Sequence, residues 1–362
     1  MFVRNCWYVA AWDYELRVGA PISRTIINEQ LVLYRTADGT PVGMEDRCCH
    51  RFAPLSKGRV EGDDIRCMYH GLKFNREGTC VEIPGQTAIP RVARVRTYPV
   101  AEKHSWIWVW MGDAASADTD LIPAAVGLAE PNWTLRSGQV DYQANYQLLN
   151  DNLTDFSHLS YVHANSFGAP PEFALTRPNI EKLERGLRFW RWIDTPSRPP
   201  LEGAASLLTD DVDSWQSYDY LVPGVLIMHS AIFPKGTADG HQRQPPDSLV
   251  RPLVQRISCQ AVTPMTDRTT RYYFSTGTPC GEGAEARADK QLEITMLAFQ
   301  EDKEMIEAQQ RVIDREPERK EMLIPADMGP AQMRGVIARM IAAESANLTP
   351  LTDPGAAPGR KG

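Results

Sequence analysis

Two short clusters of metal-binding side chains constrain this chain more than any other feature. They are Cys48-Cys49-His50 and, after the sixteen residues Arg51 to Arg66, Cys67-Met68-Tyr69-His70. Together they offer two thiolates and two imidazoles in a Cys-x-His and a Cys-x-x-His arrangement. When two His replace two Cys on one iron of a [2Fe–2S] cluster, the site is a Rieske centre, whose reduction potential lies above that of an all-thiolate ferredoxin. The fold must therefore bring two loops together, and we expect a protein that transfers electrons.

Tetrahedral zinc is the alternative for two Cys and two His. Zinc sites usually pair like ligands, whereas each cluster here contributes one Cys and one His. Such mixed pairing suits a cluster that has both thiolates on one iron and both imidazoles on the other. Gly71 and the Pro84-Gly85 pair would allow the backbone to approach inorganic sulfides closely. Cys49 is interpreted as a small buried neighbour of the ligands.

Length, charge and cysteine usage limit the class of protein. A chain of 362 residues predicts two domains. The net charge of −7 and the lack of a basic stripe argue against a nucleic-acid partner. No apolar run approaches the ~20 residues that span a bilayer, so we expect no membrane partner. Seven cysteines, two of them committed to a cluster, are typical of a reducing compartment, and we expect a cytoplasmic protein.

The element pattern predicts an α+β chain in two domains. Residues 20–112 contain short strands and turns, including the Asp38-Gly39 hairpin signal and the alternating segment HSWIWVWMGD, and predict a small all-β domain. The second half mixes strands with a helix near 143–161 and a long helix over about 284–315. We expect the first domain at 1–113, a connector at 114–130, the second domain at 131–348 and a disordered tail at 349–362.

A second group of candidate ligands lies in the segment NDNLTDFSHLSYVHANSFG. Asp155 and His158 are three residues apart and would share a helix face. His163 lies five residues beyond His158, about 140° around the axis of a regular helix. Either the helix distorts between Ser160 and Val162, or both are ordinary core histidines. The position of this segment after a Rieske domain favours a distorted helix with both histidines on one metal ion. A 2-His-1-carboxylate triad binds non-haem Fe(II) and leaves coordination positions open for O₂ and substrate.

The long helix offers the missing carboxylate. Its predicted inward stripe places Asp302 among apolar residues, and the full stripe is Leu292, Met296, Phe299, Asp302, Ile306, Gln309 and Ile313. Glu301, Lys303 and Glu304 are expected on the solvent side. A buried carboxylate is costly unless it is paired or binds a metal. Asp302 is therefore the candidate third ligand; the alternative is a helix-surface Asp whose register is misjudged by one residue.

The motifs carry a family resemblance. The segment CCHRFAPLSKGRVEGDDIRCMYHGLKF resembles the Rieske segment of the ring-hydroxylating and demethylating oxygenases, closest to the vanillate O-demethylase and dicamba demethylase group. The segment NCWYVAAW at residues 5–12 is similar to the start of that group. The likeness extends, with gaps, to about residue 345 and is weak between 165 and 285. It implies a catalytic domain with a curved antiparallel sheet packed on helices, the helix-grip or START/Bet v 1-like fold, with His158, His163 and Asp302 as Fe(II) ligands.

The resemblance also implies a role for Asp155. Subunits of that family form head-to-tail rings, in which an Asp three residues before the first iron His bridges to a cluster His of the next subunit. Carried over, Asp155 links His158 to His70 of a neighbour in a homotrimer. The alternative is that Asp155 only accepts a hydrogen bond that fixes the His158 tautomer. Asn152 could orient Asp155.

We therefore expect a terminal oxygenase component that holds one [2Fe–2S] cluster and one Fe(II) and uses O₂. Because the chain shows no flavin or nicotinamide motif, electrons should come from a separate NAD(P)H-dependent reductase with flavin and ferredoxin-type centres, with or without a ferredoxin. Hydroxylation of an O- or N-methyl group on a small aromatic substrate would release formaldehyde. The alternatives are ring or alkyl hydroxylation or dihydroxylation by the same architecture, and an electron carrier with about two rather than three Fe per chain.

Substrate contacts are the least constrained expectation. Trp192 and Trp215, among other aromatic residues of the middle strands, are candidates to enclose an aromatic ring, although aromatic stripes usually form plain core. His229 is a candidate polar contact, with a satisfied core histidine as the alternative. Arg188 and Arg191 are expected on a solvated face, and His104 and His241 in structural or loop positions.

Overall fold

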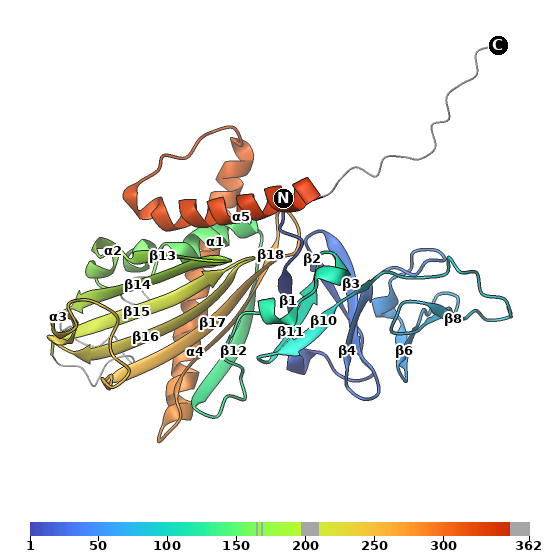
Figure 1. Cartoon of the computed structure of the whole chain (residues 1–362), viewed down its shortest axis with the longest axis horizontal. Coiled ribbons are helices and arrows are strands. Elements are labelled where there is room, and N and C mark those ends of the chain that lie inside the picture. The colour runs from blue at the N-terminus through green and yellow to red at the C-terminus, as the bar shows by residue number, and fades with distance from the viewer. Residues whose placement is uncertain (164–165, 168, 197–209, 348–362) are drawn as a thin grey trace, which may run out of the picture.

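The computed structural model describes residues 1–163, 166–167, 169–196 and 210–347 (Figure 1). The predicted tail at 349–362 lies outside this range. No helix of the described part is long and apolar enough to cross a membrane.

The first part of the chain is all β, as predicted, and forms three small antiparallel sheets. A three-stranded sheet has the order β1–β11–β10, and two four-stranded sheets have the orders β2–β3–β4–β9 and β5–β6–β7–β8. The strands are β1 (Trp7–Trp12), β2 (Ile22–Ile26), β3 (Glu29–Arg35), β4 (Pro41–Glu45), β5 (Arg59–Glu61), β6 (Asp64–Arg66), β7 (Lys73–Phe74), β8 (Cys80–Glu82), β9 (Thr97–Tyr98), β10 (Val100–Lys103) and β11 (Trp106–Trp110). Short 3₁₀ turns η1 (Asp13–Glu15) and η2 (Leu55–Lys57) interrupt them.

The second part is built on one seven-stranded antiparallel sheet in the order β12–β18–β17–β16–β15–β14–β13. Its strands are β12 (Trp133–Tyr142), β13 (Asn179–Leu183), β14 (Gly186–Thr195), β15 (Val212–Leu221), β16 (Val225–Pro234), β17 (Val254–Pro264) and β18 (Thr270–Pro279). The helices are α1 (Tyr146–Thr154), α2 (Glu172–Leu175), α3 (Thr237–Gly240), α4 (Ala284–Arg315) and α5 (Met328–Asn347), with 3₁₀ turns η3 (Ala114–Ser116), η4 (Thr119–Leu121), η5 (Phe156–Ser160) and η6 (Pro325–Asp327). This sheet with helices packed on it confirms the predicted α+β class, while the boundaries at 113 and 131 stay a prediction.

The two faces of the large sheet have different neighbours. We call the face that carries Tyr272 and Phe274 the inner face, because the ring of Phe299 on α4 packs against both, with ring centroids 5.0 and 4.8 Å away. The outer face carries Tyr273, whose hydroxyl donates to the Ala10 carbonyl of β1 at 2.5 Å. Since neighbouring residues of a strand point to opposite faces, the strand pairing assigns every sheet residue to one face.

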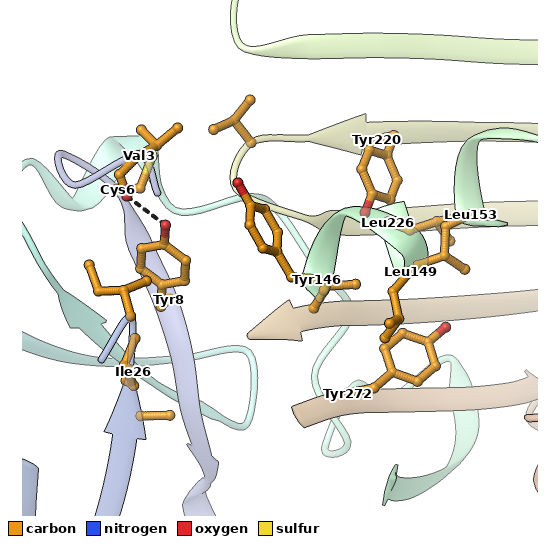
Figure 2. Close-up of a cluster of buried hydrophobic side chains, with 14 of the residues drawn as sticks. Val3, Cys6, Tyr8, Ile26, Tyr146, Leu149, Leu153, Tyr220, Leu226 and Tyr272 are labelled. Atoms are coloured by element: carbon orange, nitrogen blue, oxygen red, sulfur yellow. Dashed lines mark hydrogen bonds between the residues drawn. The ribbon is translucent and has the colours of Figure 1, made fainter. Parts of the chain in front are cut away.

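A hydrophobic core joins α1 to both parts of the chain (Figure 2). The ring of Tyr146 packs against Phe2 at 5.4 Å, and its hydroxyl donates to the Met1 carbonyl. Leu149 and Leu153 are buried in the same cluster as Tyr272. Burial of a leucine side chain stabilises by about 1.5–3 kcal/mol. Contacts on both sides therefore fix the helix whose last turn leads into the second group of candidate ligands.

Candidate metal centres

The two Cys-His loops have the same local structure. The first follows β4 and the second joins β6 to β7. In each loop the N–H of the Cys donates to a carbonyl five residues ahead, Cys48 to Ala53 at 2.9 Å and Cys67 to Leu72 at 2.8 Å. Each Cys carbonyl in turn accepts from the residue four positions ahead, which has a positive φ: Phe52 (φ 60°) or Gly71 (φ 80°). The shared turn gives both loops one geometry despite their unequal Cys-His spacing.

These loops place four ligand side chains together. The rings of His50 and His70 lie 4.6 Å apart, and the thiols of Cys48 and Cys67 are buried at 1% and 2% exposure. Burial, with Cys67 nearby, raises the pKa of the Cys48 thiol to about 12. Two buried thiols in contact can ionise together only beside a strong cation. The donor set thus fits an iron–sulfur cluster, with both sulfurs inside and both imidazoles at the exposed edge.

The turn at Gly71 is tight, as the sequence predicted. A Cβ on this residue would lie 2.7 Å from Cγ of Pro84. Cys49 lies between the two ligands of the first loop and is only partly buried.

The helix that carries the second group breaks at Asp155. We expected a distortion between Ser160 and Val162, but α1 ends at Thr154 and Asp155 is extended, with φ −135° and ψ 103°. A 3₁₀ turn, η5, follows, and Asp155 caps it by accepting from the Ser157 N–H at 2.8 Å. The break reorients the chain, so that the rings of His158 and His163 lie 5.3 Å apart.

His158, His163 and Asp302 converge on one point. Their ligand atoms all lie within 4.8 Å of one another. Oδ1 of Asp302 is 3.4 Å from Nε2 of His163 and 3.7 Å from Nε2 of His158. His163 and Asp302 are buried, at 1% and 5% exposure. Their proximity is the arrangement that the sequence predicted for a triad.

Hydrogen bonds at the far ring nitrogens fix both tautomers. Nδ1 of His158 lies 2.6 Å from the Asp155 carbonyl, and Nδ1 of His163 lies 3.0 Å from Oε2 of Glu301. Both partners only accept, so each Nδ1 carries the proton and each neutral ring turns the lone pair of Nε2 toward Asp302. Three acceptor atoms then face each other in a buried space, with the Asn152 amide as a neighbouring donor, and a cation would stabilise them. Two imidazoles and one carboxylate are the donor set of a non-haem Fe(II) site with open positions.

The neighbouring charges act on the two imidazoles differently. Burial lowers the pKa of His158 despite the Asp302 carboxylate. Burial also disfavours protonation of His163, but the carboxylates of Asp302 and Glu301 favour the charged form more strongly and together raise the pKa of His163.

Two polar side chains beside the triad differ from expectation. The Asn152 amide hydrogen-bonds toward the triad rather than to Asp155: its Nδ2 donates to Oδ1 of Asp302 at 2.9 Å and lies 3.4 Å from Nε2 of His158. Glu301 was predicted to face solvent, but its side chain is only 17% exposed and accepts from Ser166 Oγ at 2.6 Å as well as from His163. The signal that could have found Glu301 is its position next to Asp302 opposite a histidine whose second nitrogen needs an acceptor.

The predicted stripe of α4 is correct at its centre and at its two end residues, Leu292 and Ile313, which pack against the core, but it is wrong at Met296 and Gln309. Phe299, Asp302 and Ile306 are buried. Met296 is 40% exposed and Gln309 is exposed, whereas the adjacent Thr295 and Gln310 are buried in their place. An α-helix has 3.6 residues per turn, so over the 32 residues of α4 the buried position can move to a neighbouring residue, as it does from Met296 to Thr295 and from Gln309 to Gln310.

The three predicted substrate contacts lie on the other face of the sheet. Strand pairing places Trp192 opposite Trp215, and Trp215 opposite Ala231, all on the outer face. Both Trp side chains form a small core with Phe233 and Ala238. His229 lies on the same face and is exposed, so it is neither a pocket residue nor a core histidine. We correct the prediction: Trp192, Trp215 and His229 point away from the His158–His163–Asp302 group.

The two arginines of β14, Arg188 and Arg191, lie on opposite faces of the sheet. Arg188 is exposed on the outer face and paired with Asp219, as expected. Arg191, predicted to be solvated, is 5% exposed on the inner face. It donates to Oε1 of Gln216 and to the carbonyls of Phe173 and Thr176, and so holds the segment that includes α2 against the sheet.

Comparison with known proteins agrees with both centres. Residues 6–99 match the Rieske [2Fe-2S] domain, and residues 142–343 match the vanillate O-demethylase oxygenase C-terminal domain. The chain is 39% identical over 353 residues, 97% of its length and 100% of the relative's, to the iron-sulfur subunit of the toluene-4-sulfonate monooxygenase system of Comamonas testosteroni. It is 32% identical to the vanillate O-demethylase oxygenase subunit of Pseudomonas sp. (strain HR199 / DSM 7063), over 95% of this chain and 96% of that one.

Solved structures show the same architecture. Dicamba monooxygenase bound to 3,6-dichlorosalicylic acid superposes with a TM-score of 0.84 at 29% identity, covering 95% of this chain and 99% of that chain. A further structure of dicamba monooxygenase, with non-heme iron and dicamba, superposes with a TM-score of 0.75 at 28% identity, over 96% and 99% of the two chains. The chain therefore belongs to the Rieske non-haem iron oxygenases of the vanillate O-demethylase and dicamba monooxygenase group, and it is an oxygenase component whose cofactors are one [2Fe–2S] cluster and one mononuclear iron.

Proposed function

We propose that this oxygenase component removes an O- or N-linked methyl group from a small aromatic substrate. The observation that carries the proposal is the buried convergence of His158, His163 and Asp302 in a chain similar over nearly its full length to an O-demethylase subunit. When bound, the cluster would supply single electrons and the iron would supply the chemistry that activates O₂. Cys48, His50, Cys67 and His70 would hold the cluster, and the triad would hold the iron.

The balance of the reaction defines its products. One oxygen atom enters a C–H bond of the methyl group, and the other leaves as water after two electrons and two protons are supplied. The resulting hemiacetal or hemiaminal breaks its carbon–heteroatom bond and gives formaldehyde plus the phenol or amine. Electrons would come from NAD(P)H through a separate reductase with flavin and ferredoxin-type centres, with or without a ferredoxin. Because NAD(P)H is the donor, we place the reaction in the cytoplasm.

We also propose that electrons reach the iron from the cluster of a neighbouring subunit in a head-to-tail homotrimer. The sheet β5–β8, which follows the first ligand loop and contains the second between β6 and β7, lies at one end of the molecule in Figure 1. The other N-terminal strands lie between it and the large sheet. His50 and His70 are exposed, and so are the surrounding apolar side chains of Phe52, Met68 and Tyr69, at 65%, 54% and 62%. An exposed apolar rim around two ligands is typical of a surface that a partner covers.

Asp155 is the proposed link in that interface. Its carbonyl fixes the His158 tautomer, while its carboxylate caps η5 and is only partly buried. The carbonyl thus serves the tautomer role that the sequence left as the alternative, and we assign the bridging role to the carboxylate. The carboxylate would accept a hydrogen bond from His70 of the neighbouring subunit.

Alkyl hydroxylation is a second candidate, because the relative at 39% identity is named a toluene-4-sulfonate monooxygenase. The test supplies the purified protein with a compatible reductase and NADH and screens methoxy-, N-methyl- and methyl-substituted aromatics. We expect O₂ uptake with stoichiometric formaldehyde. A benzylic alcohol without formaldehyde would favour the second candidate. Oxidation of aromatic ring carbons alone, or no oxidation with any substrate of these three kinds, would contradict both.

A further inference from the structure

A row of polar side chains crosses the inner face of the large sheet. Strand pairing places Arg191 opposite Gln216, Gln216 opposite Ser230, and Ser230 opposite Arg256, on four neighbouring strands from β14 to β17. Side chains that pair directly lie about 5 Å apart at Cβ. The row is therefore continuous, with an arginine at each end.

The two arginines of this row differ in their partners. Arg191 is held by Gln216 and by two backbone carbonyls, although its Nη2 is buried without a hydrogen bond. Arg256 forms no side-chain hydrogen bond or ion pair with any residue of the described part of the chain. Its side chain is accessible to solvent, yet enough protein surrounds it for burial alone to lower the pKa of the guanidinium. A charged group in such surroundings is stabilised by an anion.

The inner face is less covered around Arg256 than near α4. On β18, beneath α4, Tyr272, Phe274 and Thr276 are buried. On β16 the inner-face residues Met228, Ser230 and Ile232 are only half-buried. The sheet thus presents an accessible surface next to Arg256 that is apolar at Met228 and Ile232 and polar at Ser230.

This surface adjoins the metal ligands. The ring of Phe156, two residues before His158, packs against Tyr218 at 4.6 Å, and Tyr218 pairs directly with Met228. The row that contains Tyr218 and Met228 is next to the row of Arg256, about 7 Å along the strands, and β15 and β17 are about 10 Å apart. A substituted aromatic ring lying over Met228 would have one end toward the His158 segment and the other toward Arg256.

We propose that Arg256 binds an anionic group of the substrate, a carboxylate or a sulfonate, with the Ser230 hydroxyl as a neighbouring donor. The planar fork of a guanidinium matches the paired oxygens of either group. The inference rests on the proposed function, because it specifies the charge of the substrate whose methyl group is oxidised. It makes Arg256 a specificity-determining residue that selects anionic over neutral aromatics.

The test measures equilibrium binding to the iron-loaded protein by calorimetry, without turnover. The probes are 4-methoxybenzoate and toluene-4-sulfonate, each beside its neutral amide, 4-methoxybenzamide and toluene-4-sulfonamide. We expect at least one anion to bind about tenfold or more tightly than its amide, and the preferred anion identifies carboxylate or sulfonate. Arg256→Met should weaken anion binding about 10- to 100-fold and leave amide binding unchanged, since a hydrogen bond to a charged group is lost. Arg256→Lys should retain part of the preference.

Arg188→Met is the matched control, because Arg188 is an exposed arginine on the outer face, and it should leave all four affinities unchanged. Equal affinity of the wild type for anions and amides would overturn the proposal. An equal loss of affinity for anions and amides in Arg256→Met would also overturn it. If Arg256→Met does not fold, Arg256→Gln takes its place in the test. If the anions bind as expected but neither anion is oxidised with reductase, the proposed function fails while the anion site stands. If the substrates are oxidised but anions and amides bind equally well, the anion site fails while the proposed function stands.

Discussion

Replacement of Glu301 tests whether a carboxylate outside the triad determines how firmly the iron is held. Its Oε2 accepts from Nδ1 of His163 at 3.0 Å and from Oγ of Ser166 at 2.6 Å. Glu301→Ala removes the acceptor of both hydrogen bonds and leaves the Nδ1–H of a fully buried histidine without a partner. Loss of such a partner typically costs 10- to 100-fold in metal affinity, which corresponds to about 1.4–2.8 kcal/mol. Glu301→Gln keeps one carbonyl acceptor, so we expect its loss of Fe(II) affinity to lie near tenfold, the lower end of this range.

The assay is Fe(II) affinity from competition with a chelator, with the visible spectrum of the [2Fe–2S] cluster as an internal control. That spectrum should not change, because Glu301 lies on α4 of the catalytic part and the cluster loops lie on other sheets. Glu304→Ala, an exposed residue of the same helix, is the matched control and should keep wild-type affinity. An affinity of Glu301→Ala within about twofold of the wild type, in a protein that keeps its melting temperature, would refute the reasoning.

Two further predictions concern Asp155 and Asp141. Asp155→Asn should keep both metals, since the backbone carbonyl that contacts His158 is unchanged, yet nearly abolish turnover with reductase; unimpaired coupled turnover would exclude the bridge. Two hydrogen bonds from Arg271, both 2.7 Å, hold the pKa of Asp141 below its usual value, so the stability that this pair adds is present above about pH 4 and is lost as the pH falls through the lower folded-state pKa. Because the pair is partly exposed, Asp141→Asn should lower the stability at pH 7 by at most about 1 kcal/mol, and the difference in melting temperature from the wild type should shrink in acid; a difference that grows in acid would contradict the sign.

Local chemistry made the ligand sets predictable. Cys48, His50, Cys67 and His70 are recognisable from spacing alone, because a cluster needs its ligands on two short turns. Asp302 stood out because a carboxylate in an apolar helix stripe is costly. A departure from regular helix geometry was also foreseeable, since a regular helix cannot direct both rings to one ion, but the sequence placed it between Ser160 and Val162, whereas the helix ends before His158, at Asp155.

The substrate side could not be predicted in the same way. Neighbouring residues along β14 to β17 point to opposite faces of the sheet, so the sequence divides their side chains into two sets. It does not tell which set faces the iron. In this fold both faces of the sheet are covered, the outer face by β1 and other N-terminal elements and the inner face by α4, so both sets are rich in apolar residues. The aromatic set with Trp192 and Trp215 belongs to the outer face, and the row that ends at Arg256 belongs to the inner one.

The amino-acid sequence by itself thus pointed to the two cofactors and to residues suited to hold them, because the cluster ligands and the two iron histidines are recognisable from short spacings and Asp302 from its place in an apolar helix stripe. The tertiary structure decided which polar groups support the ligands and which face of the sheet meets the substrate. Asn152, Glu301 and Arg256 acquire their roles only from the packing of α1, α4 and the sheet. Such contacts join residues up to 150 positions apart, as between Asn152 and Asp302, and no local pattern encodes them.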